Sequence, residues 1–172
     1  MDLKDKIKVI ENYPKKGISF KDVTTLIQEG EAFNYAIKSI SNYLRNKNID
    51  VVVGPEARGF LMGAAVAYAL GVGFIPVRKP GKLPAATANI EYELEYGFDV
   101  LEIHKDAIKP GQRVAIVDDL LATGGTIEAA TKLIESAGGE VVSLNFIIEL
   151  TELKGREKLN NYETFSLVEY SK

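Results

Sequence analysis

Apolar residues along the chain switch repeatedly between a helical period and short runs rich in β-branched residues, a pattern typical of α/β proteins. Helical stripes predict helices at residues 31–46, 59–70 and 126–136. Short apolar runs predict strands at residues 50–54, 74–77, 114–117, 141–150 and 163–170. Because the expected strands and helices alternate, the predicted fold class is α/β, with a mostly parallel central sheet and helices on both faces.

Two segments depart from this pattern. Leu3, Ile7 and Ile10 predict a short amphipathic helix that ends before Pro14. In residues 91–96, glutamates alternate with Tyr and Leu, and this period of two predicts an exposed β-ribbon or a long mobile loop instead of a core strand. With 172 residues and no repeat or linker, the chain is expected to form a single domain.

Charge and composition argue against several classes of partner and of site. The net charge is −3 and Lys and Arg are spread along the chain, which argues against a general nucleic-acid surface. No apolar run approaches the roughly 20 residues of a membrane span, and the charged N-terminus lacks the apolar core of a secretory signal. The chain has no cysteine, which excludes disulfides and thiolate sites. We expect a cytoplasmic protein without nucleic-acid or membrane partners.

Residues 114–126, VAIVDDLLATGGT, combine a buried strand, two acids, a Thr-Gly-Gly-Thr loop and a helix start. In parallel sheets, ligands bind beyond the carboxyl ends of the strands, where this loop is expected. Gly124 and Gly125 allow backbone N–H groups to approach a phosphate without a Cβ in the way. Thr123 and Thr126 add hydroxyl donors, and Thr126 lies at a helix N-terminus, which favours an anion. The segment predicts a phosphate-binding loop.

Asp118 and Asp119 leave the same strand one after the other. Carboxylates only accept hydrogen bonds, so they suit a ligand rich in hydroxyls instead of a phosphate. A phosphate loop beside such a pair indicates a 5-phosphoribosyl group. The alternative is loop chemistry alone, with Thr126 as a simple helix cap. Neither the Gly-Lys-Ser/Thr of a Walker A loop nor a GxGxxG motif is present.

This segment resembles the phosphoribosyl pyrophosphate signature of type I phosphoribosyltransferases, and VDDLLATGGT looks like the adenine-specific branch of that family. The similarity extends over about residues 17–150 and includes, in the family's order, GISFKDVTTLI, VGPEARGF, RKPGKLP, LEYG and PGQRVAIVDD. The resemblance implies that Asp118 and Asp119 bind the ribose hydroxyls. It also implies that the 5′-phosphate is held by Ala122, Thr123, Gly124, Gly125 and Thr126.

VGPEARGF resembles the pyrophosphate loop of the family, which implies ligands at Glu56, Ala57 and Arg58 and a cis peptide bond between Glu56 and Ala57. Taken alone, this segment would predict a turn and a helix start with a solvated Arg58. RKPGKLP adds Arg78 and Lys82, which the resemblance directs to the pyrophosphate, although a charge cluster is otherwise typical of a solvated face. The role of the neighbouring Lys79 stays open.

GISFKD resembles the base-binding hood of the family. The resemblance implies that Phe20 and Leu120 stack on opposite sides of a purine, while main-chain groups of Ser19 and Lys21 read its edge. The family commonly has a basic residue, often Arg, at the position of Lys21, so a main-chain role is kept and a guanidinium contact is lost. The alternative is that Phe20 belongs to an ordinary core before a helix capped by Asp22.

LEYG resembles the catalytic segment of the family, which implies that Glu95 is the catalytic acid–base residue and that Tyr96 beside it contacts substrate. Glu91 and Glu93 are predicted to form the solvated face of the ribbon. His104 is the only histidine, and the resemblance places it outside the site.

Taken together, the resemblance implies an enzyme of purine salvage that transfers the 5-phosphoribosyl group from phosphoribosyl pyrophosphate to adenine, giving AMP and pyrophosphate. Mg²⁺ is the expected cofactor, held by the substrate's pyrophosphate and ribose without protein ligands. A homodimer is implied as well. Within the single domain, about residues 1–30 are expected to form the N-terminal helix and hood, and about residues 80–97 a mobile catalytic lid. The alternatives are a phosphoribosyltransferase for another purine base and a non-catalytic regulator that binds phosphoribosyl pyrophosphate.

Overall fold

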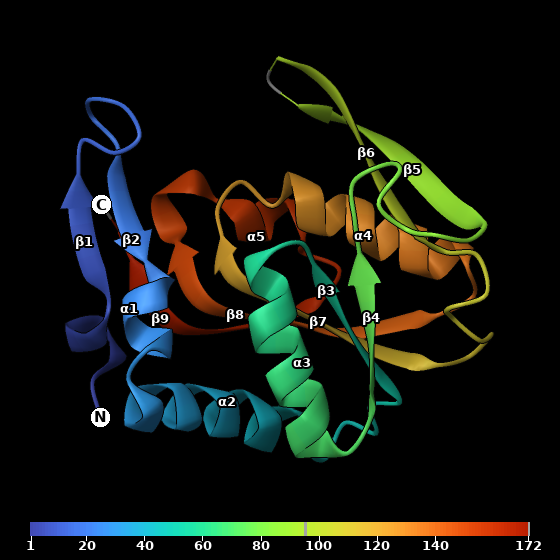
Figure 1. The fold of residues 1–172 in the computed structure, drawn as a ribbon, viewed down its shortest axis with the longest axis horizontal. Coiled ribbons are helices and arrows are strands. Elements are labelled where there is room, and N and C mark those ends of the chain that lie inside the picture. The colour runs from blue at the N-terminus through green and yellow to red at the C-terminus, as the bar shows by residue number, and fades with distance from the viewer. Residues whose placement is uncertain (95, 172) are drawn as a thin grey trace.

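The computed structural model of the protein describes residues 1–94 and 96–171. Its centre is a five-stranded sheet in the order β4-β3-β7-β8-β9, in which every neighbouring pair is parallel (Figure 1). The strands are β3 (Val51–Pro55), β4 (Gly73–Val77), β7 (Arg113–Leu121), β8 (Glu140–Leu150) and β9 (Glu163–Tyr170). The predicted parallel sheet is confirmed, and β7 extends past the predicted end at residue 117 to include both aspartates.

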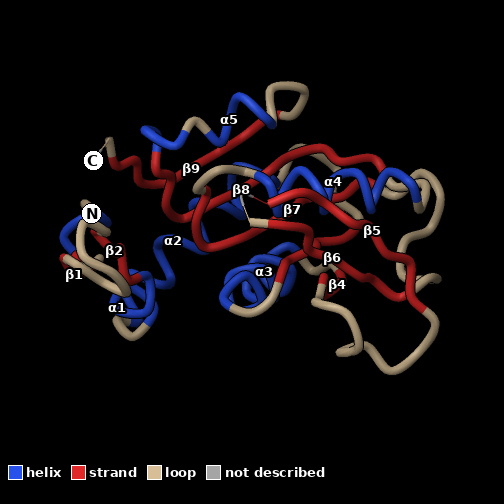
Figure 2. Tube along the Cα trace, turned by 90° about the horizontal axis from the view of Figure 1, so that it is seen from above, coloured by secondary structure: helices blue, strands red, loops and turns tan. Residues whose placement is uncertain are grey.

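Helices cover both faces of this sheet, as the alternating pattern predicted. Figure 2 shows the sheet between α2 and α3 on one side and α4 and α5 on the other. Val52 of β3 belongs to the apolar cluster under α2 and α3, whereas its neighbour Val53 belongs to the cluster under α4, because successive strand residues face opposite sides. The helices are α2 (Gly30–Leu44), α3 (Arg58–Leu70), α4 (Gly125–Ser136) and the short α5 (Gly155–Lys158).

The N-terminal segment differs from the prediction. Leu3 and Ile7 are buried, as a helical stripe requires, but only a 3-10 turn, η1 (Leu3–Lys6), forms before the chain extends into β1 (Lys8–Glu11). Strand β1 pairs antiparallel with β2 (Ser19–Asp22), which leads into α1 (Val23–Ile27). The predicted helix is wrong beyond Lys6 because residues 8–11 extend to pair with β2, which satisfies their backbone N–H and C=O groups across the ladder.

The alternating segment after β4 is a β-ribbon. Strands β5 (Thr87–Leu94) and β6 (Gly97–His104) form an antiparallel hairpin at the end of the molecule opposite β1 and β2 (Figures 1 and 2). Glu91 and Glu93 are exposed, as predicted, while Ile90 and Tyr92 pack against the core. The pattern of period two is therefore confirmed as a two-faced ribbon. No helix in the described part of the chain has both the length and the apolar composition to cross a membrane.

Candidate active site

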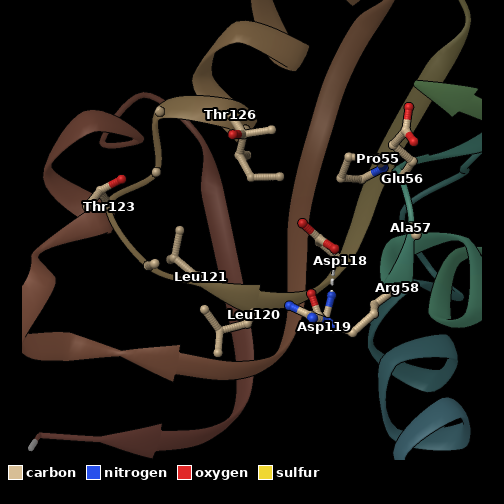
Figure 3. Close-up of a pocket in the computed structure, with 14 residues that line it drawn as sticks. Pro55, Glu56, Ala57, Arg58, Asp118, Asp119, Leu120, Leu121, Thr123 and Thr126 are labelled. Carbon is tan, nitrogen blue, oxygen red and sulfur yellow. Dashed lines mark hydrogen bonds and ion pairs between the residues drawn. The ribbon is translucent and has the colours of Figure 1, made fainter. Parts of the chain in front are cut away.

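A cavity of about 370 Å³ opens where β3 and β7 end. These strands are parallel neighbours, so the loops that follow them meet at the same edge of the sheet. In Figure 3, the loop with Thr123 and Thr126 lies on one side of the cavity, Glu56, Ala57 and Arg58 lie on the other, and the two aspartates lie between them. The predicted site residues that line this cavity are Glu56, Ala57, Arg58, Asp118, Asp119, Leu120, Ala122, Thr123, Gly124, Gly125 and Thr126.

The predicted phosphate loop connects β7 to the start of α4. Gly124 has φ of 85°, in the left-handed region that favours glycine. No side chain caps the first turn of α4, and its first residues, Gly125, Thr126 and Ile127, line the cavity. A helix N-terminus of this kind is suited to an anion. The geometry is compatible with a phosphate held between residues 122 and 126.

The two carboxylates occupy the floor of the cavity. Asp119 is 6% exposed and accepts a hydrogen bond from Nε of Arg58. Its main-chain N–H donates to Oδ1 of Asp118 at 2.8 Å. Burial, followed by repulsion from Asp119, raises the pKa of Asp118. Gly59 in α3 allows this arrangement, because a Cβ there would lie 2.7 Å from Oδ1 of Asp118.

The basic residues Arg78 and Lys82 face the carboxylate of Glu56. Lys82 Nζ lies 2.8 Å from Oε2 of Glu56, and Arg78 Nε lies 3.6 Å from Oε1. Lys79 donates its main-chain N–H to Oε1 at 2.6 Å. Burial alone would raise the pKa of Glu56, but the bonds from Lys82 and Lys79 hold it below its ordinary value. The resemblance directed Arg78 and Lys82 to the pyrophosphate, but nothing in the sequence indicated that Glu56 would pair with them in the free protein.

The peptide bond between Glu56 and Ala57 is cis, as the resemblance implied. This bond lies at the turn between β3 and α3, on the cavity wall.

Ser19, Phe20 and Lys21 of the predicted hood lie on β2, outside the lining of this cavity, whereas Leu120 on β7 is part of that lining. The guanidinium carbon of Arg58 lies 6.0 Å from the ring centroid of Phe20, so Phe20 borders the pyrophosphate loop. Lys21 is buried, and its Nζ donates to Oγ of Ser19 at 2.6 Å and lies 4.9 Å from the ring centroid of Tyr170. The Lys21 side chain is thus engaged within the protein.

Two residues of the hairpin segment, Tyr96 and His104, are not brought to the cavity. Tyr96 is 96% exposed and His104 ends β6, and neither lines the cavity. Glu95 lies outside the described residues. The catalytic role of Glu95 and the substrate contact of Tyr96 stay predictions.

Sequence reasoning missed the turn that supports the phosphate loop. A Cβ on Gly155 would lie 2.5 Å from the main-chain oxygen of Ala122, so α5 packs directly against the loop. Arg156 holds this turn in place through two nitrogens, Nε at 2.8 Å from one oxygen of Glu149 and Nη2 at 2.7 Å from the other. Glu149 is only 3% exposed. An acid inside the apolar run FIIEL was the signal that could have revealed this pairing.

Gly155→Ala is expected to lower the free energy of unfolding by about 1–3 kcal/mol, because the added methyl overpacks a backbone contact. It should also raise the KM for a ligand of the phosphate loop several-fold, since Ala122 must move. Gly30→Ala is the control, because nothing lies within 4 Å of its Cβ position. Thermal unfolding and steady-state kinetics measure both effects. Equal behaviour of the two variants would contradict the supporting role of this turn.

The cavity has few side chains that could bind a metal ion directly. In the described residues, no group of three or more His, Cys, Asp or Glu is placed to hold a metal ion. The cavity does offer the adjacent carboxylates of Asp118 and Asp119. This donor set fits a hydrated Mg²⁺ that arrives with a phosphorylated ligand and takes its ligands from that ligand and from water, with the carboxylates near enough to offset its charge.

Comparisons with known proteins agree with this geometry. The profile of the phosphoribosyl transferase domain matches residues 23–170. The chain is 71% identical to an adenine phosphoribosyltransferase of Clostridium perfringens over 170 residues, 99% of each chain. The crystal structure of adenine phosphoribosyltransferase from Thermoanaerobacter pseudethanolicus matches with a TM-score of 0.94 and 58% identity, covering 98% of both chains. The Saccharomyces cerevisiae enzyme, crystallised with adenine and an imino-altritol bisphosphate, matches with a TM-score of 0.92 and 44% identity over 96% of both. The chain belongs to the phosphoribosyltransferase family.

Proposed function

We propose that this protein transfers the 5-phosphoribosyl group of phosphoribosyl pyrophosphate to adenine, producing AMP and pyrophosphate. The observation that carries the proposal is a single cavity that unites a Thr-Gly-Gly-Thr loop at the start of α4 with two adjacent carboxylates. Such a site matches a phosphate and a vicinal diol held side by side. Adenine as the acceptor is supported by the names of the relatives and by adenine in the yeast complex.

In this proposal, substrate binding breaks ion pairs that are present in the free site and replaces them with contacts to the substrate. Arg58 turns from Asp119 to the pyrophosphate, which frees both carboxylates for the ribose hydroxyls. Arg78 and Lys82 similarly exchange Glu56 for pyrophosphate oxygens. The cations then offset the negative charge that grows on the leaving group as its bond to C1 breaks. Mg²⁺ bound with the substrate supplies further charge compensation at the leaving group.

The purine is proposed to bind at the hood, stacked between Phe20 and Leu120, with main-chain groups of Ser19 and Lys21 at its edge. The N9 atom of the purine attacks C1 of the ribose. Glu95, with Tyr96 beside it, acts as the acid–base group for the proton that the purine loses. Holding both reactants together accounts for about 7–11 kcal/mol of barrier lowering, so no covalent nucleophile is required. Residues 80–97 act as the lid that excludes water from the activated sugar.

The direct test is an assay for AMP and pyrophosphate from adenine, phosphoribosyl pyrophosphate and Mg²⁺. Hypoxanthine, guanine and xanthine are tested in parallel, because the group at purine C6 is a donor in adenine and an acceptor in those bases. A site built for one polar edge can reject the other by a factor of about 10⁴–10⁵. Faster turnover of an oxopurine would overturn adenine as the substrate. Binding of phosphoribosyl pyrophosphate without any turnover would indicate a regulator.

A homodimer through α3 is part of the proposal. The outward positions of this helix include Leu61, Ala64 and Tyr68 at helical spacing, and Tyr68 is 90% exposed. Arg58 is the only charged residue of α3, and a helix that is apolar on all sides is typical of a buried one. A second copy of this chain would cover this face and bring the interface next to the pyrophosphate loop.

We expect the wild-type protein to have twice the mass of one chain in solution and the double variant Leu61→Glu/Tyr68→Glu to be monomeric. Buried, unpaired carboxylates would be costly in an apolar interface. Tyr35→Glu is the control, because Tyr35 is an exposed aromatic on α2. Sedimentation equilibrium or light scattering measures the mass. A monomeric wild type, or a dimeric double variant, would rule out this interface.

A further inference from the structure

Lys79 contacts two separate parts of the site, although neither the cavity lining nor the proposed chemistry uses it. It follows β4 directly after Arg78, and its main-chain N–H donates to Oε1 of Glu56 in the pyrophosphate loop at 2.6 Å. Its side chain points to the β5–β6 hairpin instead, where Nζ donates to the carboxylate of Asp99 and lies 3.3 Å from the hydroxyl of Tyr92. A single residue therefore joins the pyrophosphate loop to the hairpin.

Tyr92 and Asp99 form the polar end of an otherwise apolar face. They are directly opposite each other in the antiparallel register, two positions along the strands from Ile90 and Leu101. Because side chains two apart in a strand share a face, all four lie on the inward side of the hairpin. Leu101 is buried in the core beneath α4. The hairpin is thus held by apolar packing at one end of this face and by Lys79 at the other.

The same cluster reaches the phosphate loop. The hydroxyl of Tyr92 lies 3.5 Å from Oγ1 of Thr126, which lines the cavity. A threonine hydroxyl has one proton to donate and two lone pairs that accept. Thr126 can therefore accept from Tyr92 while it donates its own proton to a bound phosphate. At 3.5 Å the contact is longer than an ordinary hydrogen bond between hydroxyls, so a small movement toward the loop would complete it.

The charge of Lys79 is already matched within the protein. The ammonium group holds the pKa of the Asp99 carboxyl below its ordinary value. The Lys79 and Asp99 side chains are 39% and 29% exposed, so water screens the pair only in part. Arg78 and Lys82 differ, because their partner is Glu56 on the wall of the cavity.

We propose that Lys79, Asp99 and Tyr92 form a positioning cluster that holds the β5–β6 hairpin in register with both the pyrophosphate loop and the phosphate loop. The inference rests on the proposed function. Lys79 in this role is a positioning residue and not a ligand of pyrophosphate. A phosphate bound in the phosphate loop orients the hydroxyl of Thr126. Through its contact with this hydroxyl, Tyr92 couples phosphate binding to the position of the hairpin that bears the LEYG segment.

The test compares Lys79→Met, Asp99→Asn and the double variant in both reaction directions. We expect each single variant to lower kcat for AMP formation about tenfold, roughly the loss of one charged hydrogen bond. The double variant should lose no more than the worse single variant, because both remove the same contact. The KM for pyrophosphate in the reverse reaction should stay within about twofold of wild type. Lys82→Met is the matched comparison and should raise that KM.

Other results would overturn the proposal. If Lys79→Met raises the KM for pyrophosphate as Lys82→Met does while Asp99→Asn leaves it unchanged, Lys79 is a pyrophosphate ligand. Additive losses of kcat in the double variant would show that Lys79 and Asp99 act separately. An inactive wild type counts against the proposed function, whereas an active wild type with unaffected variants counts against the cluster alone.

Tyr92→Phe tests the link to the phosphate loop with least disturbance, since it removes a hydroxyl and keeps the ring in the core. We expect kcat to fall about threefold, on the order of one neutral hydrogen bond, with an unchanged melting temperature. Unchanged kinetics in this variant would refute transmission through Thr126, even if the charged variants fail to fold.

Discussion

Glu95→Gln is expected to lower kcat for AMP formation by about 10²–10⁴-fold, the usual contribution of a positioned acid–base group. Glutamine keeps the size and the hydrogen-bonding capacity of the side chain but cannot take up or release the purine proton. The KM for phosphoribosyl pyrophosphate should change little, because Glu95 is not proposed to bind the sugar or its phosphates. Steady-state kinetics with adenine and Mg²⁺ measure the effect.

The chain supplies two matched controls for this substitution. Glu91 and Glu93 belong to the same alternating run, and both are exposed on the outer face of β5. Glu91→Gln and Glu93→Gln should retain wild-type kinetics. If all three variants behave alike, Glu95 belongs to the solvated face of the ribbon and its catalytic assignment is wrong.

Asp119→Asn is expected to lower kcat/KM for phosphoribosyl pyrophosphate by about 10–150-fold, equivalent to about 1.5–3 kcal/mol for a charged hydrogen bond. Asp119 is almost fully buried and lies at the centre of the cavity floor, where it is proposed to accept from a ribose hydroxyl. In the free protein it also binds Arg58. An amide places a donor and a single acceptor oxygen where two acceptor oxygens were present.

Calorimetry with phosphoribosyl pyrophosphate and Mg²⁺ should show the same loss as an increase in Kd. Asp106→Asn, at an exposed turn, is the control and should leave both kinetics and binding unchanged. The melting temperature should change far less than activity, because the Arg58 side chain is 49% exposed and can turn to water. Wild-type affinity in Asp119→Asn would mean that the acid pair does not hold the sugar.

Much of the site could be predicted because its parts are contiguous in sequence. Residues 118–126 leave one strand and enter one helix, so the order of acids, glycines and threonines already specifies a loop at the edge of the sheet. A β-ribbon was one of the two structures predicted for the alternating segment, since a period of two needs only the neighbouring residues, whereas the alternative of a mobile loop was left open. The prediction for residues 3–10 was wrong because the backbone partner of β1 lies in β2, which local periodicity does not reveal.

By itself, the sequence determined the α/β class, the loop with its acid pair, and the resemblance that assigns a role to each. Only the tertiary structure decided which charges meet. Arg58 binds Asp119, which lies 61 residues further along the chain. Glu56 forms an ion pair with Lys82, and Gly155 packs against the main chain of Ala122. Helix and strand preferences arise from the steric and hydrogen-bonding properties of residues that are close in sequence, so they can be predicted from the sequence. Ion pairs and backbone contacts between distant segments depend on the order of strands in the sheet, which is settled only when the whole core packs.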